Sequence, residues 1–155
     1  MVPTTMIELN SSNDLMASEE IKIPFHDLDP GNVVWHGRYL KYFESARTLL
    51  FEGIGYSFDE MTDSGVLWPM VDLNIRYVYP LLLNQEVRVT ACLKEWELRL
   101  VVEYEIVGGQ GVVYTRARTV QAPVNADTHE LVFGSPSILV SNVQNCLQEL
   151  STRND

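Results

Sequence analysis

The sequence is short of positive charge. Its 155 residues include 11 lysines and arginines against 21 aspartates and glutamates, which gives a formal net charge of −10. Non-specific binding to nucleic acid needs a basic surface that neutralises phosphates, and attraction to an anionic membrane needs one as well. We therefore expect neither nucleic acid nor membrane among the partners of this chain.

Cysteine is also scarce. The two cysteines, Cys92 and Cys146, are 54 positions apart and form no CxxC motif or Cys/His cluster. This pattern argues against a disulfide framework, a structural zinc site and any other metal site, and it suits a reducing compartment. The chain also has no apolar run of transmembrane length and no signal-peptide pattern at its start, so we expect a cytoplasmic protein without a metal or redox cofactor.

The composition is that of one ordinary globular domain, with 46% hydrophobic and 21% charged residues. Residues 1–18 show no sustained periodicity, and we interpret them as a flexible N-terminal arm. Residues 19–135 are expected to form the domain itself. Residues 136–155 have apolar positions at helical spacing after Pro136 and are predicted to form a helical tail.

One long helix is predicted near the start of the domain. A short strand over residues 21–25 is followed by turn-forming residues, and a helical period then begins at residue 36. The apolar stripe of this helix consists of Tyr39, Phe43, Ala46 and Leu50, widened by Leu40 and Leu49. Gly53 and Gly55 supply the stop signal, so the helix is expected over about residues 36–52, with a shorter one over 57–64.

The rest of the domain alternates between apolar and polar residues. Four strands are predicted over residues 71–79, 87–93, 100–106 and 112–120, and the Gly-Gly-Gln-Gly sequence at 108–111 is a hairpin loop. A last strand is expected near residues 130–133. The order of elements predicts an α+β domain in which the long helix covers one face of a curved antiparallel sheet.

Residues that can carry chemistry gather where the first strand passes into the long helix. Asp27, Asp29 and His36 lie in this segment. Unpaired backbone N–H groups at a helix start can polarise a carbonyl, and a carboxylate beside them can act as a nucleophile or general base. The residues alone leave other roles open: Asp29 precedes Pro30 and suits a turn, His36 suits a structural role, and Trp35 and Tyr39 suit the core.

The same segment resembles a known family signature. From Asp27 the chain reads D-x-D-P-(x)3-V-W-H-x-x-Y-L, and from Phe43 it reads F-E-x-A-R. This pattern is similar to the signature of the 4-hydroxybenzoyl-CoA thioesterase family, whose members have the hotdog fold, a long central helix wrapped by a curved sheet. The likeness continues through Trp-Pro-Met-Val at 68–71 and Tyr-x-Tyr-Pro at 77–80, and it covers about residues 19–124.

The resemblance implies roles for individual residues. Asp29 falls on the family's catalytic aspartate, and His36 falls on the histidine that orients the thioester or assists proton transfer. The backbone near Leu67 and Trp68 falls on the segment that polarises the carbonyl, although the relatives' glycine is absent here. Phe25 replaces a tyrosine found in some relatives. The complete set of substrate-binding candidates is Trp35, Tyr39, Leu67, Trp68, Arg116 and Arg118, of which the two arginines would receive the phosphates of coenzyme A.

Other charged residues are better explained by structure. Glu44 is expected to pair with Arg47 on the helix surface. The acidic residues Asp59, Glu60 and Asp63 are expected to form a solvated face.

The resemblance thus implies an acyl-CoA thioesterase that needs no cofactor, because coenzyme A is part of the substrate. A lone hotdog domain exposes an edge strand, so we expect a homodimer or homotetramer. The alternatives are a hotdog hydratase, an acyl carrier protein thioesterase, and a non-catalytic module that binds acyl thioesters.

Overall fold

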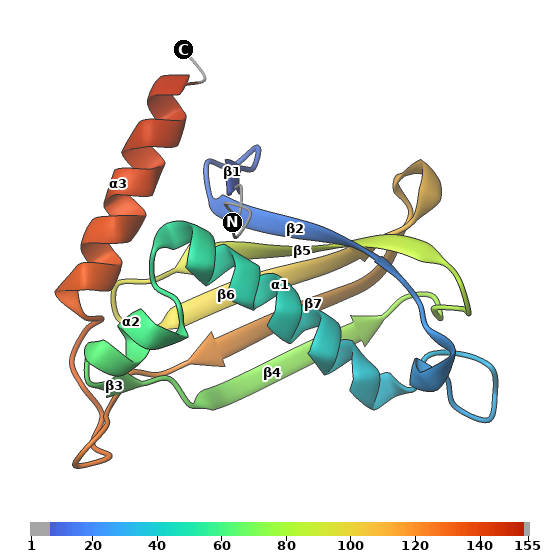
Figure 1. Ribbon diagram of the computed structural model, residues 1–155, viewed down its shortest axis with the longest axis horizontal. Helices are drawn as coiled ribbons and strands as arrows, with labels where there is room; N and C mark the ends of the chain where they lie inside the picture. Colours follow the sequence, from blue (N-terminus) through green and yellow to red (C-terminus); the bar gives the residue numbers. More distant parts are fainter. Residues whose placement is uncertain (1–6, 154–155) are drawn as a thin grey trace.

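The computed structural model describes residues 7–153, which form two sheets and three α-helices (Figure 1). The elements are β1 (Glu8–Leu9), β2 (Leu15–Lys22), α1 (Tyr39–Ile54), α2 (Phe58–Asp63), β3 (Val66–Leu67), β4 (Met70–Tyr77), β5 (Glu86–Glu95), β6 (Leu100–Val107), β7 (Val113–Gln121), β8 (Val124–Asn125) and α3 (Ser137–Arg153), with 3₁₀ turns η1 (Phe25–Asp27), η2 (His36–Arg38) and η3 (Gly109–Gly111).

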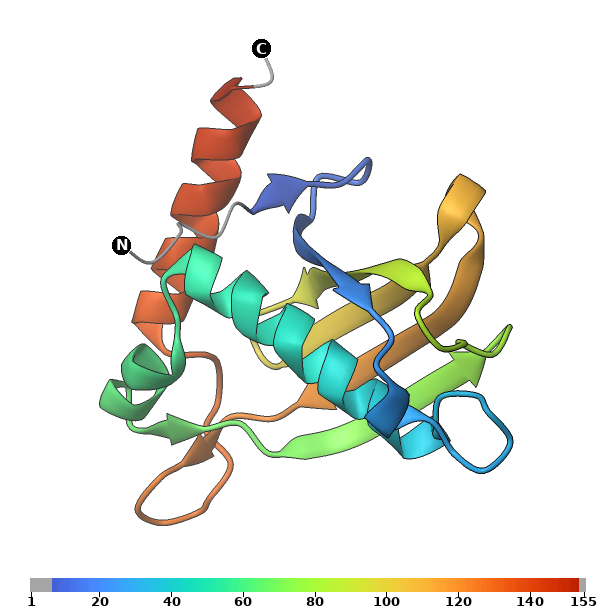
Figure 2. The ribbon, with the colours of Figure 1, turned by 45° about the vertical axis from the view of Figure 1, so that its right-hand side comes forward.

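The main sheet has six antiparallel strands in the order β1-β2-β5-β6-β7-β4, and β3 pairs separately with β8. The sheet curves around α1, which crosses one of its faces (Figure 2). The helix and sheet enclose the core because both present continuous apolar faces to each other. The predicted α+β class and the helix-on-sheet arrangement are confirmed.

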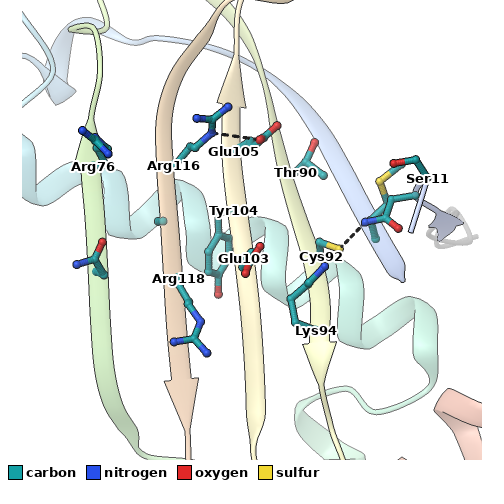
Figure 3. Close-up of a pocket in the computed structure, with 14 residues that line it drawn as sticks. Ser11, Arg76, Thr90, Cys92, Lys94, Glu103, Tyr104, Glu105, Arg116 and Arg118 are labelled. Atoms are coloured by element: carbon teal, nitrogen blue, oxygen red, sulfur yellow. Dashed lines mark hydrogen bonds and ion pairs between the residues drawn. The ribbon is translucent and has the colours of Figure 1, made fainter. Parts of the chain in front are cut away.

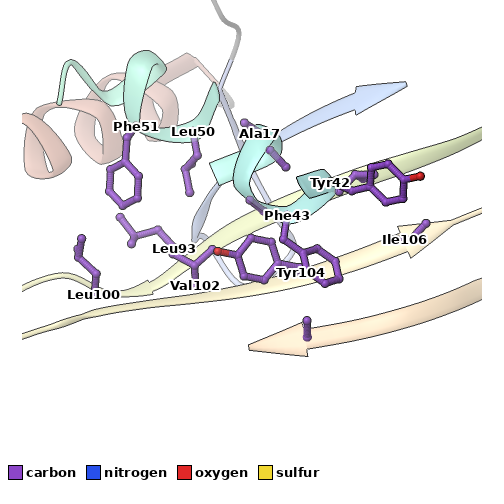
Figure 4. Packing of buried hydrophobic residues seen from close by; sticks show 14 of the residues in the cluster. Ala17, Tyr42, Phe43, Leu50, Phe51, Leu93, Leu100, Val102, Tyr104 and Ile106 are labelled. Carbon is purple, nitrogen blue, oxygen red and sulfur yellow. The ribbon is translucent and has the colours of Figure 1, made fainter. Parts of the chain in front are cut away.

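The apolar stripe of α1 packs as its spacing predicts. Tyr39, Phe43, Ala46 and Leu50 are all buried. Figure 4 shows Phe43 and Leu50 between α1 and the inner face of the sheet. Leu40 is an exception, since 39% of it remains exposed, so the stripe is narrower than predicted. The facing strand residues are all buried: Val87, Val89, Ala91 and Leu93 on β5, and Leu100, Val102, Tyr104 and Ile106 on β6.

Both ends of α1 differ by a few residues from the prediction. The chain enters the helix through η2, so regular α-helix begins at Tyr39 and not at residue 36. At the other end the helix continues through Gly53 and stops at Gly55, which has a φ of 89°. This left-handed conformation lets the Gly55 N–H bond the carbonyls of Phe51 and Glu52, and glycine adopts it without steric cost.

The flexible arm expected over residues 1–18 is wrong for the residues that the structure describes. β2 begins at Leu15, and both Leu15 and Ala17 are buried beneath α1. Pairing of β2 with β5 satisfies its backbone, and the short apolar alternation was obscured by the polar residues between. Residues 1–6 lie outside the described part. Of the strand predicted over 21–25, only Ile21 and Lys22 are in a strand, as the end of β2, and η1 begins at Phe25 after Pro24, which cannot donate to a strand ladder.

β4 is the exposed edge of the sheet. It pairs with β7 alone, and its apolar residues are left open: Val71 is 59% exposed and Leu73 is 40% exposed. The strand predicted over residues 71–79 forms as β4. Its apolar side chains stay uncovered within one chain because α1 packs over β2 and β5.

In the C-terminal part the predicted helix forms, but the predicted strand does not. α3 starts after Pro136 and buries Leu139 and Val143. No strand forms at residues 130–133, where Leu131 makes one isolated bridge to Val124. None of the helices within residues 7–153 combines the length and apolarity needed to cross a membrane.

Candidate active site

The segment between η1 and η2 forms a closed loop. The Asp29 N–H donates to the Val33 carbonyl at 2.8 Å, and Leu28 bridges Val34. The loop is also attached to the chain beyond β4, because the Val34 N–H donates to the carbonyl of Leu81 at 2.9 Å. These contacts give the loop a defined place beside the start of α1.

The Asp29 carboxylate is half-buried and helps to form the turn. Its Oδ1 accepts a 2.8 Å hydrogen bond from the Gly31 N–H. A Cβ at Gly31 would lie only 3.1 Å from that oxygen, so glycine leaves room for the carboxylate. The turn-forming role that the sequence left open for Asp29 is therefore real. The turn uses Oδ1, and Oδ2 makes no hydrogen bond within residues 7–153.

Asp29 and His36 line the same cavity. It has a volume of about 260 Å³ and is also lined by Tyr39, by Tyr77 at the end of β4, and by Tyr79 just beyond that strand. The Tyr77 hydroxyl donates to the His36 carbonyl at 2.8 Å, which ties η2 to that strand. The sequence motif thus brings a carboxylate, an imidazole and phenols to one place.

Aromatic rings surround the histidine. Trp35 lies beside His36 with ring centroids 5.1 Å apart and is 47% exposed, so it is not a core residue. Tyr39 is buried and packs edge-to-face on Tyr77 at 4.8 Å. Burial raises the pKa of both tyrosines above the ordinary value, which keeps them protonated at neutral pH.

Leu67 and Trp68 lie away from this cavity within one chain. They are at β3, at the opposite end of α1 from the Asp29 loop (Figure 1). The Trp68 indole N–H donates to the Tyr56 hydroxyl at 3.1 Å, and its carbonyl accepts from the Gln121 side chain at 2.9 Å. Leu67 is 48% exposed.

Arg116 and Arg118 lie on the outer face of the sheet, which is the face that α1 does not cover (Figure 3). The alternate residues of β7, such as Thr115 and Ala117, are buried on the helix side. Arg116 pairs with Glu105 on β6 at 3.5 Å. Both arginines line a broad cavity of about 570 Å³ together with Arg76. The structure does not bring them to the cavity of Asp29.

The sequence grouped Asp27 with Asp29 and His36, but Asp27 lies outside their cavity and lines a neighbouring one of about 250 Å³. Its side chain is completely buried, and the Tyr42 hydroxyl donates to its Oδ2 at 2.6 Å. Three basic side chains approach the same carboxylate: His26 and Arg38 at 3.7 Å, and Lys41 at 3.6 Å. The sequence feature that could have indicated these surroundings of Asp27 is the pair of basic residues Arg38 and Lys41, just after His36. Sequence reasoning missed Tyr79 as a residue that lines the cavity of Asp29, although the Tyr-x-Tyr-Pro motif includes it.

The remaining charged candidates behave as expected with one exception. Glu44 pairs with Arg47 one helical turn away. Asp59 and Asp63 are exposed on α2, whereas Glu60 is half-buried and accepts a hydrogen bond from the Ser57 hydroxyl. Within residues 7–153 no group of three histidine, cysteine or acidic side chains is arranged to hold a metal ion.

Comparison with known proteins supports the fold and a family. A family model described as the thioesterase-like superfamily matches residues 23–143. A Bacillus subtilis protein named as a candidate acyl-CoA thioesterase is 29% identical over 103 residues, which cover 66% of this chain and 75% of that protein.

Two solved structures have the same architecture. The DHNA-CoA thioesterase of Staphylococcus aureus is 24% identical with a TM-score of 0.73, covering 90% of this chain and 95% of that one. A 1,4-dihydroxy-2-naphthoyl-CoA thioesterase of Synechocystis is 16% identical with a TM-score of 0.74, covering 84% and 96%. The predicted hotdog fold is confirmed.

Proposed function

The chain belongs to the thioesterase-like superfamily, and on that premise we propose that it hydrolyses acyl-CoA thioesters to a free acid and coenzyme A. The observation that carries the proposal is the cavity shared by Asp29 and His36 at the start of α1. The name of the Bacillus subtilis relative supports coenzyme A as the carrier. Membership of the 4-hydroxybenzoyl-CoA branch stays a prediction.

The proposed chemistry uses Asp29 in one of two ways. As a general base, its Oδ2 takes a proton from water, the water oxygen bonds to the thioester carbonyl carbon, and the C–S bond breaks. The departing thiolate of coenzyme A then receives the proton. As a nucleophile, the same oxygen bonds to the carbonyl carbon, the C–S bond breaks and the coenzyme A thiolate leaves. Water then hydrolyses the resulting acyl anhydride, which restores the Asp29 carboxylate, releases the acid and supplies the proton that the thiolate takes up. His36 would orient the thioester or assist proton transfer, and no metal or redox cofactor is required.

The proposed site is completed by a second copy of the chain. The edge strand β4 carries exposed apolar side chains, including Val71, Leu73 and Tyr77, and has one free side for backbone pairing. If two copies pair antiparallel through β4 about a two-fold axis, the beginning of one strand meets the end of the other. Leu67 and Trp68 of the partner subunit would then lie beside the cavity of Asp29. A homodimer gives these two predicted substrate-binding residues a place in the site.

One observation favours a second candidate function. The Gly31 N–H already engages one oxygen of Asp29, as expected of a carboxylate that shapes a turn and performs no chemistry. A non-catalytic module that binds acyl thioesters would have the same fold and cavity. A hydratase and an acyl carrier protein thioesterase stay as alternatives within the hotdog fold.

A panel of acyl-CoA substrates distinguishes these functions. Short and long aliphatic and aromatic acyl-CoA thioesters are each incubated with the protein, and release of free coenzyme A thiol is followed. We expect saturable release with at least one substrate. Saturable binding of an acyl-CoA without any thiol release would instead establish the binding module, and hydration of an enoyl-CoA without release would establish the hydratase.

A further inference from the structure

Asp27 has a buried carboxylate, although it lies outside the cavity of Asp29 and His36. It is fully buried, and its Oδ1 makes no hydrogen bond within the described residues. A buried carboxylate is costly unless charges or donors compensate it. Here the Tyr42 hydroxyl compensates Oδ2 at 2.6 Å, and Arg38 and Lys41 supply positive charge at 3.7 and 3.6 Å.

The partners of Asp27 come from three separate segments. His26 belongs to η1, Arg38 to η2, and Lys41 and Tyr42 to the first turn of α1. The carboxylate therefore links the segment after β2 to the beginning of α1. The Tyr42 contact is buried and shielded from water, whereas the Arg38 and Lys41 side chains are 48% and 55% exposed, so solvent screens their attraction to the carboxylate.

The backbone of Asp27 closes the loop that carries Asp29. Its carbonyl accepts the Trp35 N–H at 2.9 Å, directly inside which Leu28 bridges Val34. The loop over residues 28–34 therefore begins and ends at the Asp27–Trp35 pair. His36 lies on η2, which continues directly into α1. Movement of Asp27 relative to α1 would therefore move the Asp29 carboxylate relative to His36.

We propose that Asp27 is a positioning residue, whose buried carboxylate fixes the loop at residues 28–34 against α1 and so holds Asp29 in the cavity. This inference rests on the proposed function for its effect on catalysis. A misplacement of about 1 Å can cost on the order of 100-fold in rate, so a loop that holds its carboxylate loosely is a poor catalyst even when substrate binds normally.

Two substitutions test this role, and a third serves as a control. Asp27→Asn keeps the shape and removes the charge, whereas Tyr42→Phe removes only the hydroxyl that donates to Asp27. Tyr104→Phe is the matched control, since its buried hydroxyl bonds Thr119 at 2.9 Å beneath the middle of α1, away from the loop. Each full-length protein is examined by amide hydrogen exchange and by the kinetics of acyl-CoA hydrolysis.

We expect faster exchange at the amides of Asp29 and Trp35 in both Asp27→Asn and Tyr42→Phe, with exchange in β5 and β6 unchanged. The kcat should fall by roughly ten- to a hundredfold in Asp27→Asn and less in Tyr42→Phe, while KM changes little. Tyr104→Phe should alter neither the loop amides nor kcat. If Asp27→Asn does not fold, Tyr42→Phe decides the question.

Two results would overturn the inference: loop exchange like that of the unsubstituted protein, or a mobile loop with normal kcat. A fall in melting temperature with unchanged turnover per folded molecule would likewise reduce Asp27 to a structural residue. If the unsubstituted protein hydrolyses no acyl-CoA, the proposed function fails by itself. The exchange measurement then still determines whether Asp27 fixes the loop, and wild-type-like exchange would reject it.

Discussion

Asp27 and Asp29 are two residues apart, yet their carboxylates lie in opposite surroundings. Asp27 is buried among cations and Tyr42, whereas Asp29 is half-buried and borders a cavity. The motif predicted that Asp29, His36 and Tyr39 would belong together, and the structure gives them one cavity. The residues of the motif do not show that Asp27 is buried and Asp29 is not, because this difference depends on which side of the turn faces α1.

His36 provides the first prediction at this scale. Its imidazole is exposed beside Trp35 and borders the cavity, so it can contact a thioester without supporting the core. His36→Ala should reduce kcat by roughly ten- to a hundredfold, less than the loss of Asp29 would cause. The measurement is thiol release per folded molecule, with thermal unfolding alongside. Unchanged turnover with a lower melting temperature would show a structural histidine.

Tyr42 provides the second prediction, on pH and stability. Burial and, to a lesser extent, its hydrogen bond to Asp27 raise the pKa of Tyr42 well above the ordinary tyrosine value of about 10. A raised pKa contributes stability that is fully present below the unfolded pKa and is lost as pH rises above it. The free energy of unfolding should therefore fall from about pH 10 upward. In Tyr42→Phe that fall should be shallower when urea unfolding is compared at pH 9 and pH 11, and an equal slope would contradict it.

At the scale of elements, sequence periodicity predicts the burial of α1 and of the central strands. It does not predict the surroundings of the two edges of the sheet. Helical spacing identified Phe43 and Leu50 as core because the central apolar positions of that stripe meet the sheet, although Leu40 at its margin does not. The apolar face of β4 met nothing in its own chain, and periodicity cannot say whether a neighbour exists. At the other edge, Leu15 was assigned to a loose arm because its strand carries few apolar residues.

The exposed edge gives a prediction about assembly. A lysine on an edge strand opposes pairing with another strand, so Leu73→Lys should prevent association through β4. We expect a monomer by analytical ultracentrifugation, with reduced thiol release and a nearly unchanged melting temperature. Leu98→Lys is the control, since Leu98 is 60% exposed in the turn between β5 and β6. A dimer that persists in Leu73→Lys would place the interface elsewhere.

At the scale of the whole molecule, the net charge of −10 bears on which carrier presents the acyl group. Folding gathers Arg76, Arg116 and Arg118 on the outer face, with Arg76 directly opposite Arg116. Acidic residues of β6 lie directly opposite the two arginines of β7, and Glu105 pairs with Arg116. The arginine group is thus partly neutralised. This gathering could not be predicted from the sequence, because it depends on the strand order.

We predict a preference for acyl-CoA over the same acyl group on acyl carrier protein. Acyl carrier proteins are strongly acidic, and two surfaces of like charge repel during encounter. The measurement compares kcat/KM for both carriers at low and physiological salt. A preference for the protein-bound substrate that strengthens as salt is lowered would show that the arginine group outweighs the net charge.

The replacement Asp29→Asn tests the central claim most directly. It keeps the shape of the side chain and its bond to Gly31 but removes the basicity that hydrolysis requires. With the best acyl-CoA of the panel, kcat should fall on the order of 100-fold or more while KM stays near that of the unsubstituted protein. Asp59→Asn, on the exposed face of α2, should leave kcat unchanged. Near-normal turnover in Asp29→Asn would contradict the account.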